Sequence, residues 1–507
     1  MKTYHTIKTL ALGGITMFSL ASCSLDYEPL SEPSEITQGG QTETSTAVLK
    51  DKAAADAQLK SLYELFRNRQ EHTHLDYLLI GDSHSDNAYA GTTGAEVVPY
   101  ETNSIDASNS VLSRDWNRYL EDIAKANVLI NGVEQLKENG QISEAEYHSY
   151  KAQGEIFRAL MMFRMARLWG SFPVITTIAK TITSENINEV YPTYYPPRKT
   201  PKECYEQIIA DLTDAEQYAP DNDNSDRTKM TKTVAQAMLA KVYAEKEVQD
   251  YDKVIAYADK VMNTTGVELE DSYETLWGYD ETAIDCMKRN TKEGILEVHW
   301  SGGGNWETWM YGRQLDNWDY YFTWAKWITP SRDIINDFDK EGDEVRKNQA
   351  IVYYACTWSN YYPASNYPFM YKLRSSYNNI YWVRLADIIL MKAEAEAYKG
   401  NLAESAKLVN QIRKRAKLKD LTSDKTGSKE AMIEAVLHER RLELAFEGER
   451  WFDLCRNNKV EKYLNGIDNR DSGRIRQVKQ FDSNSYLLPI PQTALDQNTN
   501  LEQNPGY

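Results

Sequence analysis

The sequence predicts a mainly α-helical fold, in which tetratricopeptide-like helix pairs form a scaffold for a large irregular face rich in loops. Apolar residues recur at three- and four-residue steps through several long segments, as they do along the buried face of a helix. These segments come in pairs with alanines where two helices would cross, which is typical of helical repeats. Long stretches rich in aromatic residues, glycine and asparagine separate the pairs and predict the loops.

Residues 1–22 have the order of a secretory signal peptide. Lys2 and Lys8 supply the positive charge, and an apolar core follows that is shorter than the roughly 20 residues needed to span a bilayer. The Leu-Ala-Ser sequence before Cys23 resembles a bacterial lipobox, whose cysteine is lipid-modified and becomes the new N-terminus. An ordinary secreted protein with a cysteine near the cleavage site is the alternative.

Residues 23–46 are expected to form a flexible, lipidated tether. They are rich in Ser, Thr, Glu, Gln, Gly and Pro, so they bury too little apolar surface to offset the entropy lost on ordering. A flexible segment of this length holds the folded body on the order of 25 Å from the lipid. The remaining residues, 47–507, are expected to form one domain with a loop-rich insertion at about 266–381.

Three helix pairs are expected within this domain. They comprise residues 150–168 with 201–218, 233–245 with a helix through Val261, and 384–399 with 402–416. Glycine or proline follows several of these segments and supplies a stop signal. Plain antiparallel pairs that form no superhelix are the alternative interpretation.

Two stretches between the helices are candidates for a binding site. Residues 300–327 hold six of the 12 tryptophans, interleaved with Gly, Asn and Asp. Residues 81–113 combine Asp, Asn, Tyr and Gly between two helical segments. Loops of this length in a folded domain usually carry function. The 34 tyrosines and 12 tryptophans, against 11 phenylalanines, favour a contact surface where rings meet polar groups.

Composition excludes several classes of protein. The net charge of −17 argues against nucleic acid, which needs a basic face, and against adhesion to an anionic membrane. The five cysteines lack the close spacing of metal or redox sites, and a disulfide framework is disfavoured but left open.

No catalytic, metal or cofactor motif is complete. His438 begins a zinc-protease-like motif without its second histidine, so residues 438–442 predict a charged helix. Residues 221–226 resemble a calcium loop but lack its glycine and closing glutamate, which favours a solvated loop. The spacing of three other histidines and a nearby aspartate, His72, His74, His84 and Asp86, fits no common metal site. A pair of glycosidase carboxylates leaves little sequence trace and stays open.

Several motifs together resemble the SusD/RagB outer-membrane lipoproteins of Bacteroidetes. The most recognisable is residues 439–454, Glu-Arg-Arg-Leu-Glu-Leu-Ala-Phe-Glu-Gly-Glu-Arg-Trp-Phe-Asp-Leu. Others are Trp116 to Asn127, Phe157-Arg158-Ala159 with Gly170 and Pro173, Arg384 to Ala395, Asn410 to Ala416, Leu488 to Gln492 and Gln503 to Tyr507. The charges Glu447, Arg450, Asp453 and Arg456 recur at three-residue steps and are expected to form structural ion pairs.

The resemblance implies four tetratricopeptide-like helix pairs and a role without catalysis or cofactor. It implies that the protein captures oligosaccharides at the cell surface, anchored in the outer membrane through Cys23, and delivers them to a SusC-like TonB-dependent transporter. A peptide or another nutrient is the alternative ligand, and a glycosidase is a remote alternative.

We expect the binding site to combine stacking rings with hydroxyl-binding groups. The predicted residues are Trp306, Trp309, Tyr311 and Trp318, assisted by Asp82, Asp86, Asn87 and Tyr89. For each tryptophan, packing in the core or against the transporter is the alternative. Trp324 and Trp327, near Pro330, are expected in the core.

Overall fold

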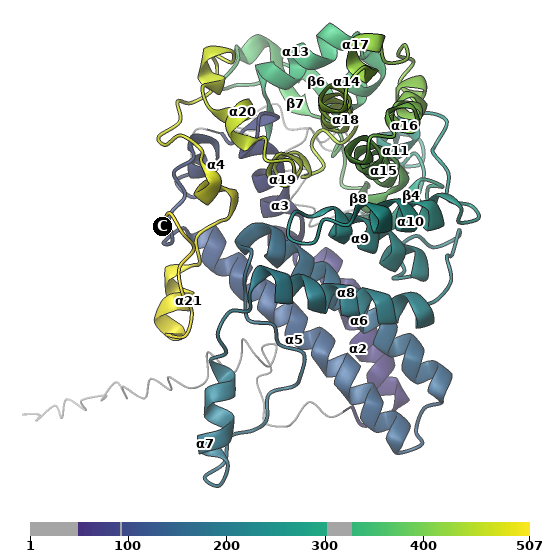
Figure 1. The fold of residues 1–507 in the computed structure, drawn as a ribbon, viewed down its shortest axis with the longest axis vertical. Coiled ribbons are helices and arrows are strands. Elements are labelled where there is room, and N and C mark those ends of the chain that lie inside the picture. The colour runs from purple at the N-terminus through teal and green to yellow at the C-terminus, as the bar shows by residue number, and fades with distance from the viewer. Residues whose placement is uncertain (1–48, 92–93, 302–326) are drawn as a thin grey trace, which may run out of the picture.

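The computed structural model describes residues 49–91, 94–301 and 327–507 (Figure 1). The signal peptide, Cys23 and the tether therefore lie outside the described residues. No helix within the described ranges combines the length and apolar character needed to cross a membrane. The four cysteines that the structure describes, Cys204, Cys286, Cys356 and Cys455, are free thiols.

The N-terminal half is a layer of long antiparallel helices. It contains α2 (Lys52–Asn68), α5 (Ser110–Glu138), α6 (Glu144–Trp169) and α8 (Pro201–Tyr218). Helix α6 packs between α5 and α8. Both α6 and α8 begin with a capping box, from Ser143 and Thr200, and such a box satisfies backbone N–H groups that the first helical turn leaves unpaired.

The scaffold continues as a chain of packed helices. It is formed by α9 (Lys232–Ala244), α10 (Tyr251–Met262), α15 (Leu385–Lys399), α16 (Leu402–Arg415), α18 (Lys429–Glu443) and α19 (Arg450–Arg456). Each of α8, α9, α10, α15 and α16 packs on the next, and α18 covers α15 and α16. The three expected pairs are confirmed, and the scaffold is tetratricopeptide-like because successive pairs stack on one another.

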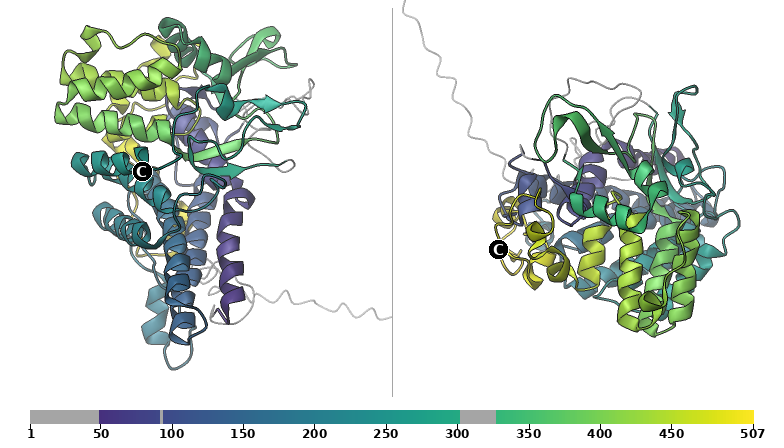
Figure 2. Two further views of the ribbon diagram at one scale, coloured as in Figure 1. Left: turned by 90° about the vertical axis from the view of Figure 1, so that its right-hand side faces the viewer. Right: turned by 90° about the horizontal axis from the view of Figure 1, so that it is seen from above.

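Short strands and short helices fill the described part of the predicted insertion. The strands form four two-stranded antiparallel sheets in the described ranges: β1 (Ala88–Tyr89) with β5 (Thr329–Pro330), β2 (Tyr279–Asp280) with β3 (Asp285–Cys286), β4 (Gly294–His299) with β8 (Asn379–Arg384), and β6 (Ile351–Tyr354) with β7 (Tyr367–Met370). The short helices here are α11 (Glu274–Trp277), α13 (Arg332–Glu341) and α14 (Glu344–Ala350). The strands gather beside the helical scaffold, at one side of the molecule (Figure 2).

Shorter segments complete the described chain. Two π-helical segments, η1 (Glu71–Leu75) and η2 (Leu79–Ser83), flank α3 (Asp76–Leu78). The others are α4 (Val98–Thr102), α7 (Ile187–Val190), the 3-10 helices η3 (Tyr191–Tyr194), η4 (Ala364–Asn366), η5 (Ile467–Asn469) and η6 (Ser483–Tyr486), α17 (Ser423–Thr426), α20 (Val460–Leu464) and α21 (Gln492–Gln497).

Helix α6 is the centre of the core, and it is buried on all sides rather than on one face. Every residue from Ala152 to Trp169 is buried, including three arginines. Arg158 donates two hydrogen bonds of 2.7 Å to Asp211 of α8, and the Arg164 guanidinium lies 3.5 Å from the ring centre of Trp382. The apolar periodicity therefore predicted the helix but underestimated its burial, because long-range partners compensate its charges.

The backbone of η2 touches the turn before α19 at two glycines. A Cβ added at Gly81 would lie 2.2 Å from the carbonyl oxygen of Gly448. We expect Gly81→Ala to lower the free energy of unfolding by about 3 kcal/mol, because neither backbone can move without disturbing a packed core. Urea denaturation measures this change.

Gly140→Ala is the matched control. Its Cβ would meet no described atom within 4 Å, so only the left-handed backbone, φ 69°, opposes the substitution. That conformation costs about 1 kcal/mol. Equal stability of the two variants would contradict the close approach at Gly81.

Candidate functional site

The first of the two loop-rich stretches meets the segment that directly follows the second. Strand β1, within residues 81–113, pairs with β5, which begins two residues after Trp327, so that Tyr89 lies opposite Thr329. Just beyond β5, Ser331 donates a backbone hydrogen bond of 2.9 Å to the Asn87 carbonyl and a side-chain bond of 2.7 Å to the Asp86 carbonyl. Segments more than 200 residues apart are thus joined into one surface.

Aromatic rings gather against this ladder. Tyr89 stacks on Tyr361 with ring centres 4.3 Å apart and an interplanar angle of 23°. Trp358 meets Tyr367 of β7 edge to face at 4.4 Å, and Tyr362 lies 5.7 Å from the same ring. We call these five residues the aromatic cluster. Ring pairs with this geometry fix one another beyond the effect of burial alone.

Hydrogen bonds hold the inner phenols of the cluster in place. The Tyr89 hydroxyl donates to Asp471 at 2.6 Å, and the Tyr361 hydroxyl donates to Glu101 at 2.7 Å. Burial raises the pKa of both phenols, and the neighbouring carboxylates raise it further. Both hydroxyls therefore stay protonated and keep donating at neutral pH.

The cluster has an accessible edge. Trp358 and Tyr362 are half-buried, and the Arg332 guanidinium lies 4.2 Å from the Tyr362 ring centre. Tyr354 of β6 lies opposite Tyr367 of β7 and is 38 % exposed. This edge presents ring faces, phenol hydroxyls and one guanidinium, a combination that can stack on an apolar ring face and hydrogen-bond to its hydroxyl groups.

The tryptophan-rich part of the predicted site falls outside the described residues. Trp306, Trp309, Tyr311, Trp318 and also Trp324 belong to residues 302–326. In the chain they lie between β4 and β5, and β5 pairs with β1 beside the aromatic cluster. Trp327 is half-buried against two hydrophobic clusters, as expected for a core position.

The other predicted site residues lie in the interior. Asp82, Asp86, Asn87 and Tyr89 are each 0 % exposed. These side chains are bound by the protein itself, so we assign them to the support of the site rather than to its surface. Their ligand contact stays a prediction that no described contact supports.

Asp82 ties its loop to the turn between α18 and α19. One carboxylate oxygen accepts from the backbone N–H of Phe446 at 3.0 Å, the other from that of Gly448 at 2.9 Å. Asn87 donates a third bond of 2.9 Å. Burial raises the pKa of Asp82 to about 6, because these hydrogen bonds offset only part of the desolvation.

Asp86 is a fully paired buried carboxylate. Arg450 of α19 donates two hydrogen bonds to it, at 2.8 and 2.9 Å, and Arg441 of α18 lies 3.4 Å away. Burial alone would raise the pKa of Asp86, but the two arginines outweigh burial and hold it well below its ordinary value. Removing this carboxylate would leave the Arg450 guanidinium in the interior without its carboxylate partner, whereas Arg441 keeps Asp333 and Asp337.

The expectation that the charges of residues 447–456 form structural ion pairs is confirmed. Most of these charges pair with residues outside the block rather than with one another. Within the block, Asp453 pairs with Arg456 at 2.9 Å. The remaining partners lie far away in the sequence, as in Glu447 with Arg384 at 2.7 Å and Arg456 with Glu394 at 2.8 Å. These groups are buried and paired, which assigns them to the scaffold.

The side chains of the motifs that resembled metal sites pair with other groups of the protein. His72 bonds to Asp122 at 2.8 Å, His74 to the Phe66 carbonyl at 2.9 Å, and His438 pairs with Glu341 at 3.2 Å. In the 221–226 loop, Lys229 pairs with Asp223 at 2.6 Å, and Lys232 with Asp221 at 3.1 Å. Across the part of the chain that the structure describes, no group of three or more His, Cys, Asp or Glu could hold a metal ion.

Sequence reasoning missed the aromatic residues of β6 and the loop after it. Residues 353–362 read Tyr-Tyr-Ala-Cys-Thr-Trp-Ser-Asn-Tyr-Tyr. The signal was the same as in residues 300–327, namely rings interleaved with turn-forming polar residues. It is weaker because the stretch holds one tryptophan rather than six.

A helical scaffold that presents a loop-built aromatic edge defines a class of binding proteins, and the sequence comparisons identify the family. The SusD family model matches residues 292–507, and a second model, described as starch-binding associating with outer membrane, matches residues 41–244. The chain belongs to the SusD family.

Relatives and solved structures agree with this assignment. The chain is 27 % identical over 440 residues to SusD-like protein P2 of Formosa agariphila, covering 79 % of this chain and 81 % of that one. It is 24 % identical to a SusD-like protein of Bacteroides ovatus, covering 78 % and 74 %. A SusD superfamily structure from Bacteroides vulgatus superposes with a TM-score of 0.72 at 20 % identity, covering 91 % of this chain and 100 % of that one. A structure titled laminarin binding SusD-like protein superposes with a TM-score of 0.68 at 22 % identity, covering 90 % of this chain and 100 % of that one.

The raised pKa of Asp82 predicts a pH dependence of stability. Because the folded value of about 6 exceeds the ordinary 3.8, this group's contribution is fully present below pH 3.8 and is lost as the pH rises through 6. Two pKa units correspond to about 3 kcal/mol. The free energy of unfolding of the wild type, minus that of Asp82→Asn, should fall by about this amount between pH 4 and 7.

Denaturant titrations across this pH range measure the difference, and the subtraction removes the other titrating groups. A difference that stays constant, or rises with pH, would contradict the placement of Asp82 among backbone donors in the interior.

Proposed function

We propose that this protein is a glycan-binding lipoprotein of the cell surface, anchored in the outer membrane through Cys23, which delivers oligosaccharides to a SusC-like TonB-dependent transporter. The observation that carries the proposal is the accessible edge of the aromatic cluster, formed by Tyr354, Trp358 and Tyr362. The protein acts by binding and not by catalysis.

The chemistry of this edge suits a sugar. The C–H faces of a pyranose ring are apolar and stack on aromatic rings, while its hydroxyls need hydrogen-bonding groups nearby. Arg332 supplies a donor next to the Tyr362 ring.

The predicted tryptophans extend this surface in our proposal. Trp306, Trp309, Tyr311 and Trp318 lie on the chain between β4 and β5, and β5 pairs with β1, which carries Tyr89 of the cluster. The printed names of the matched model and of one structural neighbour, which mention starch and laminarin, support a glycan as the ligand. The name of that model also supports an outer-membrane location.

Removing single rings tests the site. We expect Trp358→Ala, Tyr354→Ala, Trp306→Ala and Trp309→Ala each to weaken binding of the preferred oligosaccharide about tenfold, because one stacked ring contributes about 1.4 kcal/mol. Isothermal titration of the soluble mature domain against a panel of defined oligosaccharides measures the affinity. Thermal unfolding checks that each variant remains folded.

Tyr218→Ala is the matched control, since Tyr218 is 40 % exposed at the end of α8, outside the cluster. Unchanged binding in all four ring variants would overturn the proposed site. Binding of defined oligopeptides, with no glycan bound, would replace the glycan with a peptide.

The anchor has its own test. Cys23→Ser removes the thiol that accepts the lipid, so we expect the protein to leave the membrane fraction. Cell fractionation and metabolic labelling with a palmitate analogue measure this, with Cys204→Ser as the control, because Cys204 is a buried free thiol. Labelling that persists in Cys23→Ser would contradict the assignment.

A further inference from the structure

One guanidinium at the accessible edge of the aromatic cluster lacks an acidic partner. Arg332, the first residue of α13, is half-buried, and its guanidinium lies over the Tyr362 ring at 4.2 Å from the ring centre. No carboxylate among the described residues lies within 4.0 Å of it. The helix dipole favours negative rather than positive charge at this end of α13. Because the chain carries a net charge of −17, composition does not account for an unpaired cation here.

The acids beside Arg332 are bound by other groups. Asp333 follows it in the sequence but pairs with Arg441 at 2.9 Å. Asp471 accepts a hydrogen bond of 2.6 Å from the Tyr89 hydroxyl, and Nη1 of Arg332 donates to that same hydroxyl oxygen at 3.2 Å. The phenol hydroxyl therefore bridges the guanidinium and Asp471, and no direct ion pair forms between them.

Glu101, a third acid beside the cluster, is also occupied. It accepts from the Tyr361 hydroxyl at 2.7 Å and from two backbone N–H groups at 2.8 and 3.0 Å. Burial raises the pKa of Glu101, because it outweighs these hydrogen bonds and the nearby charge of Arg474. Arg474 also lies 4.0 Å from Asp471, so it is the cation that faces both buried acids. None of the three acids bonds to the Arg332 guanidinium.

The protein nevertheless holds this guanidinium in one orientation. Nη1 donates to the Tyr89 hydroxyl and Nη2 to the Tyr361 carbonyl, while the backbone N–H of Arg332 donates to the same hydroxyl at 3.0 Å. A guanidinium has five N–H donors, so three have no partner among the described residues. A planar fork that is fixed in place suits an oxyanion, which can accept two hydrogen bonds from it.

Gly473 makes room for the guanidinium. A Cβ added at this position would lie 1.5 Å from Nη1 of Arg332 and 3.1 Å from the Tyr89 hydroxyl oxygen. Gly473 is not among the glycines with a left-handed backbone, so here the missing side chain matters for space and not for conformation. The chain around Gly473 thus packs directly against the Arg332 side chain.

The loop that contains Gly473 is basic. We call residues 470–479 the basic loop; it contains one acid, Asp471, and four cations, Arg470, Arg474, Arg476 and Lys479. Arg474 donates a hydrogen bond of 3.0 Å to the Ala88 carbonyl of β1, which fastens the loop beside the cluster. Arg476 and Lys479 are exposed, and neither has a carboxylate within 4.0 Å among the described residues. The segment next to Arg332 therefore adds positive charge to this side of the cluster.

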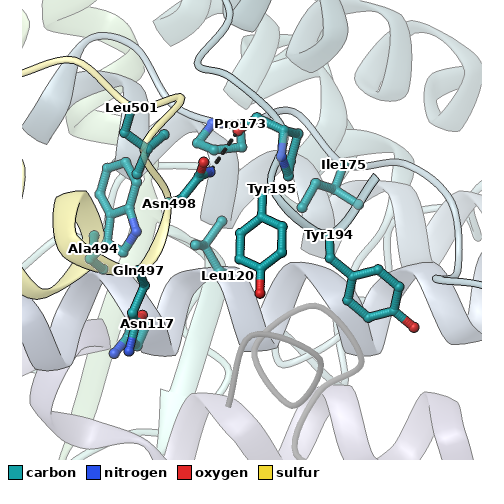
Figure 3. A pocket seen from close by; sticks show the side chains of 12 residues that line it. Asn117, Leu120, Pro173, Ile175, Tyr194, Tyr195, Ala494, Gln497, Asn498 and Leu501 are labelled. Atoms are coloured by element: carbon teal, nitrogen blue, oxygen red, sulfur yellow. Dashed lines mark hydrogen bonds between the residues drawn. The ribbon is translucent and has the colours of Figure 1, made fainter. Parts of the chain in front are cut away.

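An apolar pocket between α5 and α21 lacks these features. Figure 3 shows that rings, aliphatic side chains and amides line it, among them Tyr194, Leu120 and Asn498. None of its lining residues carries a charge. Asn498 donates a hydrogen bond of 2.9 Å to the Pro196 carbonyl. An anionic ligand would lose hydration in this pocket without gaining a cation, so charge favours the aromatic cluster.

We propose that the ligand of the aromatic cluster is an acidic glycan, whose carboxylate or sulfate group binds the Arg332 guanidinium while the sugar ring that carries it stacks on the accessible rings. This inference rests on the proposed function and names the class of glycan. Arg332 is the residue that distinguishes an acidic sugar from a neutral one, and Gly473 positions it.

Matched acidic and neutral oligosaccharides test the inference on the wild-type protein. The uronate probes are oligosaccharides of polygalacturonate and alginate, each paired with its carboxyl-reduced form. The sulfate probes are carrageenan oligosaccharides, each paired with its desulfated form, and malto- and laminari-oligosaccharides are further neutral probes. We expect an acidic member to bind about tenfold more tightly than its neutral counterpart, because a charged hydrogen bond is lost with the charge. Isothermal titration of the soluble mature domain measures this ratio, and the two arms separate carboxylate from sulfate.

Two variants assign the preference to Arg332. We expect Arg332→Gln to weaken binding of the preferred acidic oligosaccharide about tenfold more than binding of its neutral counterpart. Gly473→Ala keeps the charge but displaces the guanidinium, so it should lower the same ratio. Lys202→Gln is the control, because it removes one positive charge from a side chain that is 80 % exposed on α8. Thermal unfolding checks that each variant remains folded.

The outcomes distinguish this inference from the proposed function. Neutral oligosaccharides that bind as tightly as acidic ones would overturn the inference and leave a glycan-binding protein. An acidic preference that survives in both Arg332→Gln and Gly473→Ala would refute the role of Arg332, as would an equal loss in Lys202→Gln. A wild-type protein that binds none of the oligosaccharides would refute the proposed function itself.

Discussion

The structure depends on charges that neutralise one another in its interior, with Glu443 at their centre. Arg346 of α14, Arg384 of β8 and Arg415 of α16 all pair with this carboxylate. Burial would raise the pKa of Glu443, but the three arginines outweigh burial and hold it well below its ordinary value. Since breaking a buried pair by removing one partner costs several kcal/mol, the elements that carry these charges must assemble together. The network thus specifies how the loop-rich insertion meets the helical scaffold.

A second set of buried charges positions the candidate site. Arg441 and Arg450, from either side of the turn after α18, hold Asp86, while the backbone of that turn holds Asp82. These contacts fix the loop that leads into β1, and β1 carries Tyr89 into the aromatic cluster. The rigid part of the site is therefore built from buried charges, and the accessible rings stand on it. Because the buried charges and the accessible rings are separate, a substitution among the rings can change the ligand without disturbing the buried charges.

By itself the sequence determined the helix pairs and the family, because helical periodicity and the 439–454 block are local patterns that few other folds produce. It also predicted that the charges of this block are structural. Only the tertiary structure decided their partners: Asp86 meets Arg450 across 364 positions, and no local pattern records such a contact. For the same reason Asp82, Asp86 and Asn87 resembled loop surface in the sequence. Polar residues avoid the interior unless distant groups pair with them, and the fold supplied those groups.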